Sequence, residues 1–366
     1  MPPGHRPPRT VTTAHLRLRP MTDDDALDPR ILRWHTDPRG YELMYERPYR
    51  DTATATARLR SWAARWGSVG VGYWIAERDG LPVGIGGVDP LQHEGRDHLN
   101  LYYRLDPSAR GQGFAREIAT AATAYAAEWW PDRSVVARIA PTNGPSLKVA
   151  RAAGLVDLGP RRAPQDPGDL PAPRFLRSPF ARVGPVHAGD SAYDELLDLW
   201  CRVNDSGGAV GFEPRAPREA VAEALDRHLT DPHTTLVRLH APTTRGQDDP
   251  PATGPLLGFG FVVLASHFAM RHRCSLMRVM TDPDQRGVNL GRLLMSALHA
   301  RARKHGRELV QIDYRGGTGL GAFYERCGYV ETGRMPGGLR FSFGDRDDVA
   351  MTRRLDGLPL PGSTNT

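Results

Sequence analysis

At 366 residues the chain is longer than most single hydrophobic cores, which favours two domains. An apolar content of 40%, with 32 prolines and 39 glycines, indicates many turns, and no stretch of roughly 18 uncharged apolar residues is present to cross a membrane. The net charge of +6 would suit a nucleic-acid partner, but no Lys/Arg-rich block occurs and almost every basic residue is arginine, so we expect no nucleic-acid binding.

The two ends and the cysteines indicate a cytoplasmic protein. Residues 1–13 are basic and proline-rich without the apolar core of a secretory signal, and we expect them and the tail 356–366 to be disordered. Cys201, Cys274 and Cys327 lack disulfide or metal spacing, which fits a reducing compartment. The sequence therefore predicts neither a disulfide framework nor a metal site.

A first set of elements is predicted within residues 14–158. The stretch 72–88 reads as two strands joined by an Asp-Gly turn, a strong hairpin signal. The next strand, 98–105, ends at an Asp-Pro, and apolar residues at helical spacing follow from Phe114. A strand at 134–140 and a short helix complete the set.

The same set recurs in residues 186–355. Two strands, 234–242 and 256–264, are joined by a polar loop that we expect to be mobile, and a third strand spans 274–281. Asp-Pro, an Arg-Gly turn and a helix from Leu290 come next, then a strand at 308–315 and a short helix. One unit is thus built twice, because chance rarely matches five elements in order. Residues 159–185, dense in proline, are predicted to form an extended linker.

A turn between a strand and a helix recurs in both units, as DPSARGQG (106–113) and DPDQRGVN (282–289). First-turn amides lack intrahelical acceptors and carry the positive end of the helix dipole, so such a turn binds anions. Glycine lets the backbone approach a pyrophosphate. The turn lacks the Gly-Lys-Ser/Thr of a P-loop and does not follow a first strand, as it would in a Rossmann unit.

The two turns resemble those of the GNAT superfamily of acyl-CoA-dependent N-acetyltransferases, whose signature is Arg/Gln-x-x-Gly-x-Gly/Ala. Arg110, Gly113 and Ala115 satisfy it in full, whereas Asn289 replaces a glycine in the second copy. HLRLRPMTDDDA and NGPSLKVARAAGL make the N-terminal unit similar to ribosomal-protein N-terminal acetyltransferases, and GAFYERCGYVETGR makes the C-terminal unit similar to a general GNAT domain. The resemblance implies an α/β fold of two tandem GNAT domains, each with a mixed, mostly antiparallel, splayed sheet and about four helices.

The resemblance also implies acetyl-CoA as cofactor, with the pantetheine arm beside the strand before the turn and backbone amides polarising the thioester. The implied contacts in the N-terminal unit are Tyr103, Leu105, Arg110, Gly111, Gln112, Gly113, Phe114, Ala115 and Asn143, the last an equally good helix cap. Those in the C-terminal unit are Val279, Thr281, Arg286, Gly287, Val288, Asn289, Leu290 and Gly291.

Proton transfer distinguishes the two units. Tyr324 occupies the position of the family's usual acid, although it could also be a packing residue. Its N-terminal counterpart is Ala150, so Ser146 is the nearest hydroxyl there. No general base stands out; Glu94, Asp97 and Asp313 could each act through water. The Gly-rich segment 203–212 is either a flexible loop or a substrate lid.

We therefore expect an N-acetyltransferase that moves an acetyl group to an amine by direct attack in a ternary complex. The acceptor is a small-molecule or peptide amine, the molecule is a monomer or homodimer, and the C-terminal unit is favoured as the catalytic one. Two alternatives stay open. One is an aminoacyl-tRNA-dependent amide-forming transferase, which would use the basic pI of about 9.4. The other is a catalytically silent CoA-binding protein.

Overall fold

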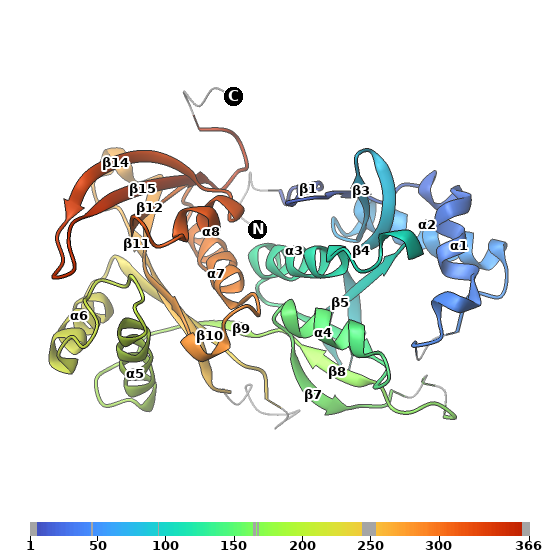
Figure 1. Cartoon of the computed structure of the whole chain (residues 1–366), viewed down its shortest axis with the longest axis horizontal. Helices are drawn as coiled ribbons and strands as arrows, with labels where there is room; N and C mark the ends of the chain where they lie inside the picture. The colour runs from blue at the N-terminus through green and yellow to red at the C-terminus, as the bar shows by residue number, and fades with distance from the viewer. Residues whose placement is uncertain are drawn as a thin grey trace. The chain divides into compact units, whose positions relative to one another are not determined.

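This computed structural model describes residues 6–44, 47–93, 95–163, 166, 168–243 and 254–360, and the chain divides into two compact units. The N-terminal unit holds mainly residues 7–179, and the C-terminal unit mainly residues 180–241 and 254–360. Figure 1 colours the first from blue to green and the second from green to red. Each unit is α/β, with one mixed, mostly antiparallel sheet flanked by helices, as the sequence predicts.

The N-terminal unit has an eight-stranded sheet in the order β1-β2-β3-β4-β5-β6-β8-β7. Its strands are β1 (Val11–Thr12), β2 (Arg17–Pro20), β3 (Tyr73–Arg78), β4 (Leu81–His93), β5 (Arg96–Leu105), β6 (Ser134–Ile139), β7 (Val156–Pro160) and β8 (Arg174–Arg177). Its helices are α1 (Pro29–Thr36), α2 (Thr52–Ser68), α3 (Phe114–Trp129) and α4 (Gly144–Ala152). The expected hairpin is β3–β4, and its Asp79 and Gly80 both take positive φ, 51° and 79°.

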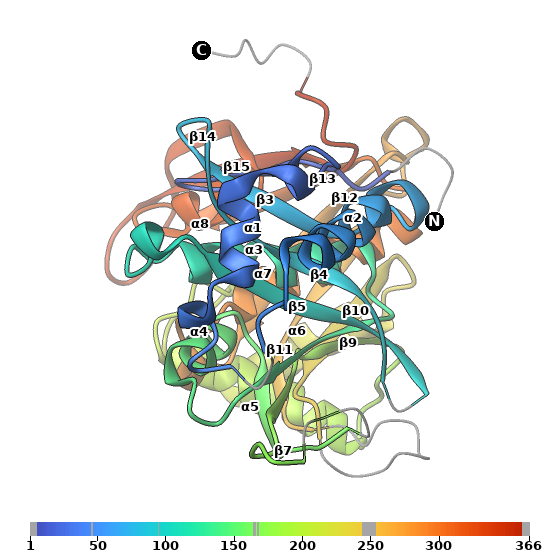
Figure 2. The ribbon, with the colours of Figure 1, turned by 90° about the vertical axis from the view of Figure 1, so that its right-hand side faces the viewer.

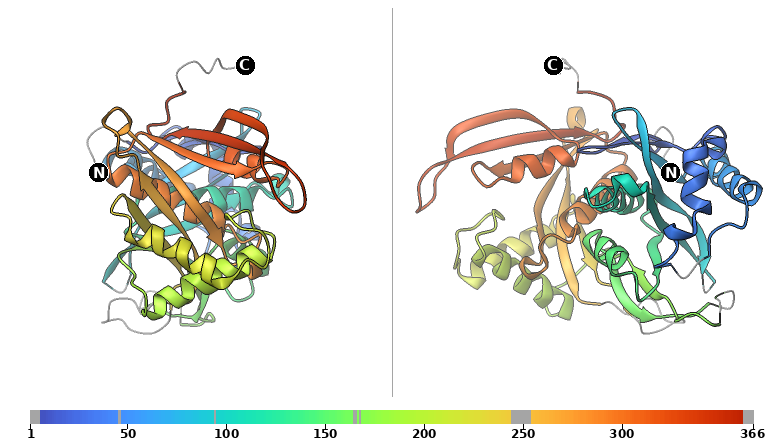
Figure 3. Two further views of the ribbon diagram at one scale, coloured as in Figure 1. Left: turned by 90° about the vertical axis from the view of Figure 1, so that its left-hand side faces the viewer. Right: turned by 45° about the vertical axis from the view of Figure 1, so that its right-hand side comes forward.

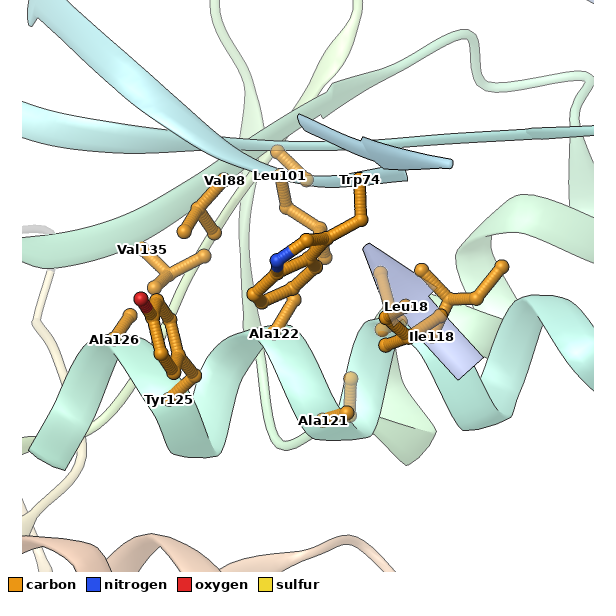
Figure 4. Close-up of a cluster of buried hydrophobic side chains, with 14 of the residues drawn as sticks. Leu18, Trp74, Val88, Leu101, Ile118, Ala121, Ala122, Tyr125, Ala126 and Val135 are labelled. Atoms are coloured by element: carbon orange, nitrogen blue, oxygen red, sulfur yellow. The ribbon is translucent and has the colours of Figure 1, made fainter. Parts of the chain in front are cut away.

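Two cores pack on the opposite faces of this sheet. Alternate residues of β3 belong to different cores: Trp74 packs with α3, whereas Ile75 packs with α1 and α2. In Figure 4 the apolar side chains of α3, among them Ile118 and Tyr125, point toward the strands. Figure 2 shows α1 and α2 in front of the strands of this unit. The face covered by α1 and α2 is called the acceptor face below.

The C-terminal unit has a seven-stranded sheet in the order β14-β15-β13-β12-β11-β10-β9. Its strands are β9 (Phe180–Val183), β10 (Thr234–His240), β11 (Leu256–Leu264), β12 (Arg273–Thr281), β13 (Leu309–Arg315), β14 (Val330–Leu339) and β15 (Arg346–Arg354). Its helices are α5 (Ser191–Asp205), α6 (Arg218–Thr230), α7 (Leu290–Lys304) and α8 (Leu320–Arg326). The left panel of Figure 3 shows α5 and α6 in front of the strands, and that covered face is the acceptor face of this unit.

The two sheets share one topology. Leaving β1 aside, β2-β3-β4-β5-β6-β8-β7 runs in the same order as β9-β10-β11-β12-β13-β15-β14. In each sheet a single parallel pair, β5 with β6 or β12 with β13, interrupts the antiparallel ladder. The prediction that one unit is built twice therefore extends to strands that the sequence comparison did not pair.

The segments expected to lack structure differ from the prediction. Within the segment 1–13, Val11 and Thr12 form β1, and the carbonyls of Pro8 and Arg9 accept hydrogen bonds of 3.0 and 2.8 Å from Tyr125 and the Trp74 indole. These hydrogen bonds order residues 8–12, which their composition alone predicts to be disordered.

The predicted linker 159–185 is also part of both sheets. It supplies β8 to the N-terminal sheet and β9 to the C-terminal sheet, so only Ser178 and Pro179 lie between them. Phe175 and Leu176 are buried in the N-terminal unit, and their apolar side chains repay the ordering of a proline-rich stretch. Residues 244–253, the centre of the loop expected to be mobile, and residues 361–366 of the tail lie outside the described residues.

Two further observations apply to the described ranges alone. None of their helices combines the length and apolar character that crossing a bilayer needs. In the same ranges, no group of three or more His, Cys, Asp or Glu side chains is arranged to hold a metal ion.

Candidate active site

The N-terminal Arg-Gly turn is held in place by Asp106. Its carboxylate accepts hydrogen bonds from the Ser108 amide at 2.9 Å, the Ser108 hydroxyl at 2.6 Å and the Trp34 indole of α1 at 2.8 Å. Gly111 and Gly113 then take φ values of 77° and 84°, and a Cβ on either would meet no atom within 4 Å. The turn is therefore open on the side where a phosphate would approach.

Helix α3 begins at this turn with Gly113 as its N-cap and no side chain capping its first amides. The Gln112 side chain is used within the turn, since it accepts from Arg78 at 2.7 Å and donates to the Ser108 carbonyl at 3.1 Å. A hollow beside the turn is lined by Arg33, Trp34, Asp37, Arg39, Gly40, Leu105, Pro107 and Arg110. Arg33 and Arg110 bring positive charge to this hollow, whereas Arg39 is paired with Asp37 at 2.7 Å.

The C-terminal turn has the same design. Asp282 accepts from the Asp284 amide at 3.2 Å and from Arg202 of α5 at 3.0 Å, so this turn is again tied to the first helix of its unit. Gly287 and Asn289 take φ values of 80° and 64°, and the Asn289 side chain does not cap α7. Asparagine tolerates this left-handed conformation, and the backbone path of the glycine-containing turn is preserved.

The first turn of α7 also explains the glycine at position 291. A Cβ there would lie 3.2 Å from the Phe323 ring of α8, so the two helices approach closely only because position 291 has no side chain. The corresponding N-terminal residue is Ala115, which packs against the core of its unit.

In the N-terminal unit β5 and β6 separate beyond Asn100 and Val136, where their parallel pairing ends. The gap is lined by residues of β5, β6 and α4, including Tyr103, Ile139, Asn143 and Ser146. The Tyr103 hydroxyl crosses it and donates to the Ser146 carbonyl at 2.9 Å. Burial raises the pKa of Tyr103, so its phenol stays neutral.

Asn143 and Ser146 lie at the start of α4. The Asn143 side chain accepts from the Ser146 amide at 3.1 Å and caps the helix, which is one of the two roles expected for it. The position matching Tyr324 is Ala150, which is buried in the core. The N-terminal gap is thus lined by a strand phenol already engaged in a backbone hydrogen bond, with the Ser146 hydroxyl nearby.

In the C-terminal unit β12 and β13 separate beyond Ser275 and Gln311. Here β12 is not regular: Met277 pairs with Phe261 and Met280 with Phe259, so Arg278 and Val279 stand opposite the single residue Gly260. This is a β-bulge, which interrupts the ladder at the strand position expected to face the thioester. By contrast, β5 pairs with β4 without interruption from Arg96 to Leu105.

Tyr324 of α8 lies among aromatic rings. Its ring centroid is 5.7 Å from that of Tyr314 on β13 and 6.0 Å from that of Tyr329. Burial raises the pKa of Tyr324 to about 12, so it is a protonated phenol at neutral pH. Tyr314 belongs to β13, one of the two strands that separate, and Tyr324 belongs to α8, the helix that follows β13 in the chain.

Two of the three carboxylates considered as bases are engaged with neighbouring side chains. Asp97 sits at the start of β5, away from the turn, and pairs with Arg133 at 3.2 Å. Asp313 is exposed on β13 and accepts from Gln311 at 3.1 Å. Glu94 lies outside the described residues. Two of the three cysteines are poor nucleophiles, because burial raises the pKa values of Cys201 and Cys274, the latter to about 12.

Sequence reasoning missed two ionisable residues on the acceptor faces. Asp89 of β4 lies 3.6 Å from Arg65, and burial raises the pKa of its carboxyl to about 6 in spite of that arginine. Arg278 sits in the bulge of β12. Neither position belongs to a sequence motif. Only strand alternation, which puts Asp89 and the core residue Val88 on opposite faces of β4, could have suggested Asp89.

Comparison with known families agrees with the geometry. Residues 15–156 match one acetyltransferase (GNAT) domain model, and residues 252–331 match a second one. The chain carries two GNAT acetyltransferase domains. It is accordingly a GNAT-family acetyltransferase, and members of this family use acetyl-CoA.

Solved structures similar to this chain include three acetyltransferases. They are the Escherichia coli ribosomal-protein-S18-alanine N-acetyltransferase (16% identity, 50% of this chain and 99% of the other, TM-score 0.36), the Brucella melitensis ribosomal-protein-alanine N-acetyltransferase (16%, 48% and 99%, 0.37) and a GCN5-related N-acetyltransferase from Kribbella flavida (17%, 48% and 97%, 0.38).

Proposed function

We propose that the C-terminal GNAT domain is the catalytic one and that it transfers an acetyl group from acetyl-CoA to an amine by direct attack in a ternary complex. The N-terminal domain binds CoA through its complete turn in a structural or secondary role. The observation that carries this proposal is the bulge at Arg278 and Val279. The C-terminal half has both this bulge and Tyr324, whereas the N-terminal half has neither the bulge nor the tyrosine.

The geometry of the two turns supports the proposed cofactor contacts. The pyrophosphate lies on the uncapped amides at Gly111–Ala115 in one half and at Gly287–Gly291 in the other, where Arg110 and Arg286 supply positive charge. The pantetheine arm enters the gap beside the preceding strand. Within the C-terminal gap the backbone amides of Val279 and Thr281 polarise the thioester carbonyl. The interrupted ladder leaves backbone N–H groups to donate to the tetrahedral oxyanion.

Tyr324 supplies the proton. The amine nitrogen forms a bond to the thioester carbon, the carbon–sulfur bond breaks, and the departing thiolate takes the phenolic proton of Tyr324. The proton lost from the amine passes through water and restores the phenol. With a pKa of about 12 the phenol holds its proton across the neutral range and gives it up only to a developing anion.

The direct test is acetyl transfer by the full chain to a panel of small amines and N-terminal peptides, followed by mass shift. Calorimetry with CoA is expected to give two sites for the wild type and one for Gly113→Asp, since a carboxylate beside the phosphates is repelled. Gly80→Asp is the matched control, because Gly80 has the same open surroundings and a φ of 79° in a hairpin turn. One site in the wild type, or no acetylation of any amine, would contradict the proposal.

A further inference from the structure

Arg278 combines two costly features at one position. Its φ of 54° lies in the left-handed region, which a long side chain rarely adopts. Its guanidinium is half-buried on the acceptor face beside the proposed thioester site at Val279. Strain and a desolvated charge together need a compensating interaction, and such positions are found at functional sites.

The groups around this guanidinium provide no negative charge. It lies over the Trp200 ring of α5, 5.6 Å from the centroid, and a Cβ on Gly211 would collide with it. In the parts of the chain that the structure describes it forms no hydrogen bond or ion pair, and its charged neighbour is Arg227. Nearby His228 is neutral at physiological pH, since burial first and Arg278 second lower its pKa to about 4.

The loop over Arg278 is fixed from a second side. Glu213, two residues after Gly211, accepts from the amide and the hydroxyl of Ser342 at 2.6 and 2.5 Å. The segment 206–217, between α5 and α6, is thus tied to the segment 340–345 between β14 and β15. This contact lies directly after the segment 203–212, the expected loop or lid, whose Gly211 lies against Arg278.

Partial burial of an arginine is not sufficient for a binding site. Arg301 of α7 is also half-buried, and no acidic group perturbs its guanidinium. It has regular helical geometry, however, and it belongs to α7 and not to the bulged strand. The N-terminal counterpart of Arg278 is Tyr102, whose hydroxyl is paired with His35 at 3.2 Å and Arg104 at 2.8 Å. Arg104 of β5 is also buried, but its guanidinium donates to backbone carbonyls and to the Tyr102 hydroxyl, whereas Arg278 has no such partner among the described residues.

We propose that the acceptor of the C-terminal domain carries an anionic oxygen group, a carboxylate or a phosphate, and that Arg278 binds this group. The inference rests on the proposed function of that domain and names its substrate class. Because Arg278 is adjacent to Val279, we expect the anion and the attacking amine to belong to one small molecule. An amino acid, the C-terminal residue of a very short peptide, or an aminophosphonate meets that requirement, whereas a simple alkylamine does not.

The test uses the full chain with acetyl-CoA and matched acceptor sets: amino acids, their carboxamides, and the aminoalkyl phosphonates of the same length. We expect the wild type to favour an anionic member over its carboxamide by at least tenfold in kcat/KM. The choice between carboxylate and phosphonate identifies the anion.

Variants of Arg278 test whether this residue causes the preference for an anionic acceptor. Arg278→Gln is expected to lower kcat/KM for the anionic acceptor by about 100-fold and for the carboxamide less than about threefold, while Arg278→Lys restores part of the loss. Arg301→Gln, the half-buried control, leaves both values unchanged. Equal losses on both acceptors for Arg278→Gln, or a wild-type preference for the carboxamide, would overturn the proposal.

A binding measurement separates this inference from the proposed function. If no acceptor is acetylated, thermal shifts of the CoA-bound chain are measured with the same three ligand sets. Stabilisation by the anionic ligands in the wild type but not in Arg278→Gln keeps the anion site and rejects catalysis. No difference between the two proteins rejects the anion site itself.

Discussion

The two halves have the same strand order, yet their equivalent strands β5 and β12 differ at the proposed point of reaction. Strand β5 is regular, and its Tyr103 crosses the gap to hydrogen-bond the Ser146 carbonyl. Strand β12 bulges at Arg278, and the equivalent of Tyr103 is the short Val279. The phenol of the C-terminal half comes instead from the helix, as Tyr324. A duplicated fold therefore keeps the Arg-Gly turn twice, while the bulge and the phenol on the helix are present in one copy.

The Arg-Gly turn and the proposed reaction centre depend on different structural features. A turn needs an Asp-Pro, two residues with positive φ and a helix, and Asn289 meets the φ requirement as a glycine would. A reaction centre needs an extra strand residue and a phenol on a neighbouring helix. In this chain the turn is built with Gly113 in one half and Asn289 in the other, whereas the bulge and the helix phenol occur in the C-terminal half.

The largest effect is expected from a charge placed in the C-terminal turn. Asn289→Asp changes almost no volume and keeps a residue type that tolerates positive φ, but it sets a carboxylate at the start of α7. Repulsion of the pyrophosphate should lower acetyl-CoA-dependent turnover at least ~100-fold at subsaturating cofactor. Gly113→Asp places a carboxylate at the equivalent position of the other half, with an added side chain, and should leave turnover within about threefold. Steady-state kinetics on both variants compare the two turns, and the reverse pattern would assign catalysis to the N-terminal half.

The second effect concerns stability and the buried carboxyl of the N-terminal half. The folded-state pKa of Asp89, about 6, exceeds its ordinary value of 3.8, so the ionised form is destabilised in the folded protein above pH 6 and the penalty vanishes below pH 4. Asp89→Asn should raise the free energy of unfolding by on the order of 2 kcal/mol at pH 7, with no gain at pH 4.

Chemical denaturation at the two pH values checks this expectation, with turnover measured alongside. Unchanged turnover fits a passive carboxyl. A loss of activity in Asp89→Asn would instead show that the carboxylate acts as a base and that the N-terminal half is the enzyme.

A smaller effect follows from the bond across the N-terminal gap. Tyr103→Phe removes the hydroxyl that donates to the Ser146 carbonyl and should cost about 1 kcal/mol of unfolding free energy. Because this gap is not the proposed reaction site, kcat should stay within about twofold. Calorimetric melting and steady-state rates test the two statements separately, and a large fall in kcat would place chemistry at Tyr103.

The smallest effect is expected in the pH dependence of kcat/KM. With a pKa of about 12, Tyr324 does not lose its proton below about pH 10, so kcat/KM should rise as the acceptor amine deprotonates and then stay level. A rate profile from pH 6 to 10 measures it. A descending limb near pH 8 would point to a different proton donor.

Much of the fold was predictable because its signals are local. Asp79-Gly80 sets a hairpin, Asp-Pro stops a strand, and apolar spacing from Phe114 sets one face of α3. The ends of the two units were less accessible: β9 depends on pairing with the distant strand β10, whereas β1 pairs locally with β2 but lies in a proline-rich segment that concealed it. Asn143 was predicted correctly as a possible cap because its side chain acts three residues along the chain.

The reaction centre was only partly predictable for the same reason. Tyr324 was found through a motif on a single helix. The bulge at Arg278 was not, because it is defined by the pairing of β12 with β11 and leaves no composition signal. Asp89 was missed because its burial depends on α2, which packs over it from another part of the sequence.

The central claim is that the C-terminal half performs the chemistry, and Tyr324→Phe tests it most directly. The change removes one hydroxyl and keeps the ring packed among Tyr314 and Tyr329. Kinetics of the full chain with saturating acetyl-CoA should show a fall in kcat of about 10²-fold or more, with an unchanged Kd for acetyl-CoA. Full activity in Tyr324→Phe, together with a comparable loss in Ser146→Ala, would contradict the account and assign catalysis to the N-terminal half.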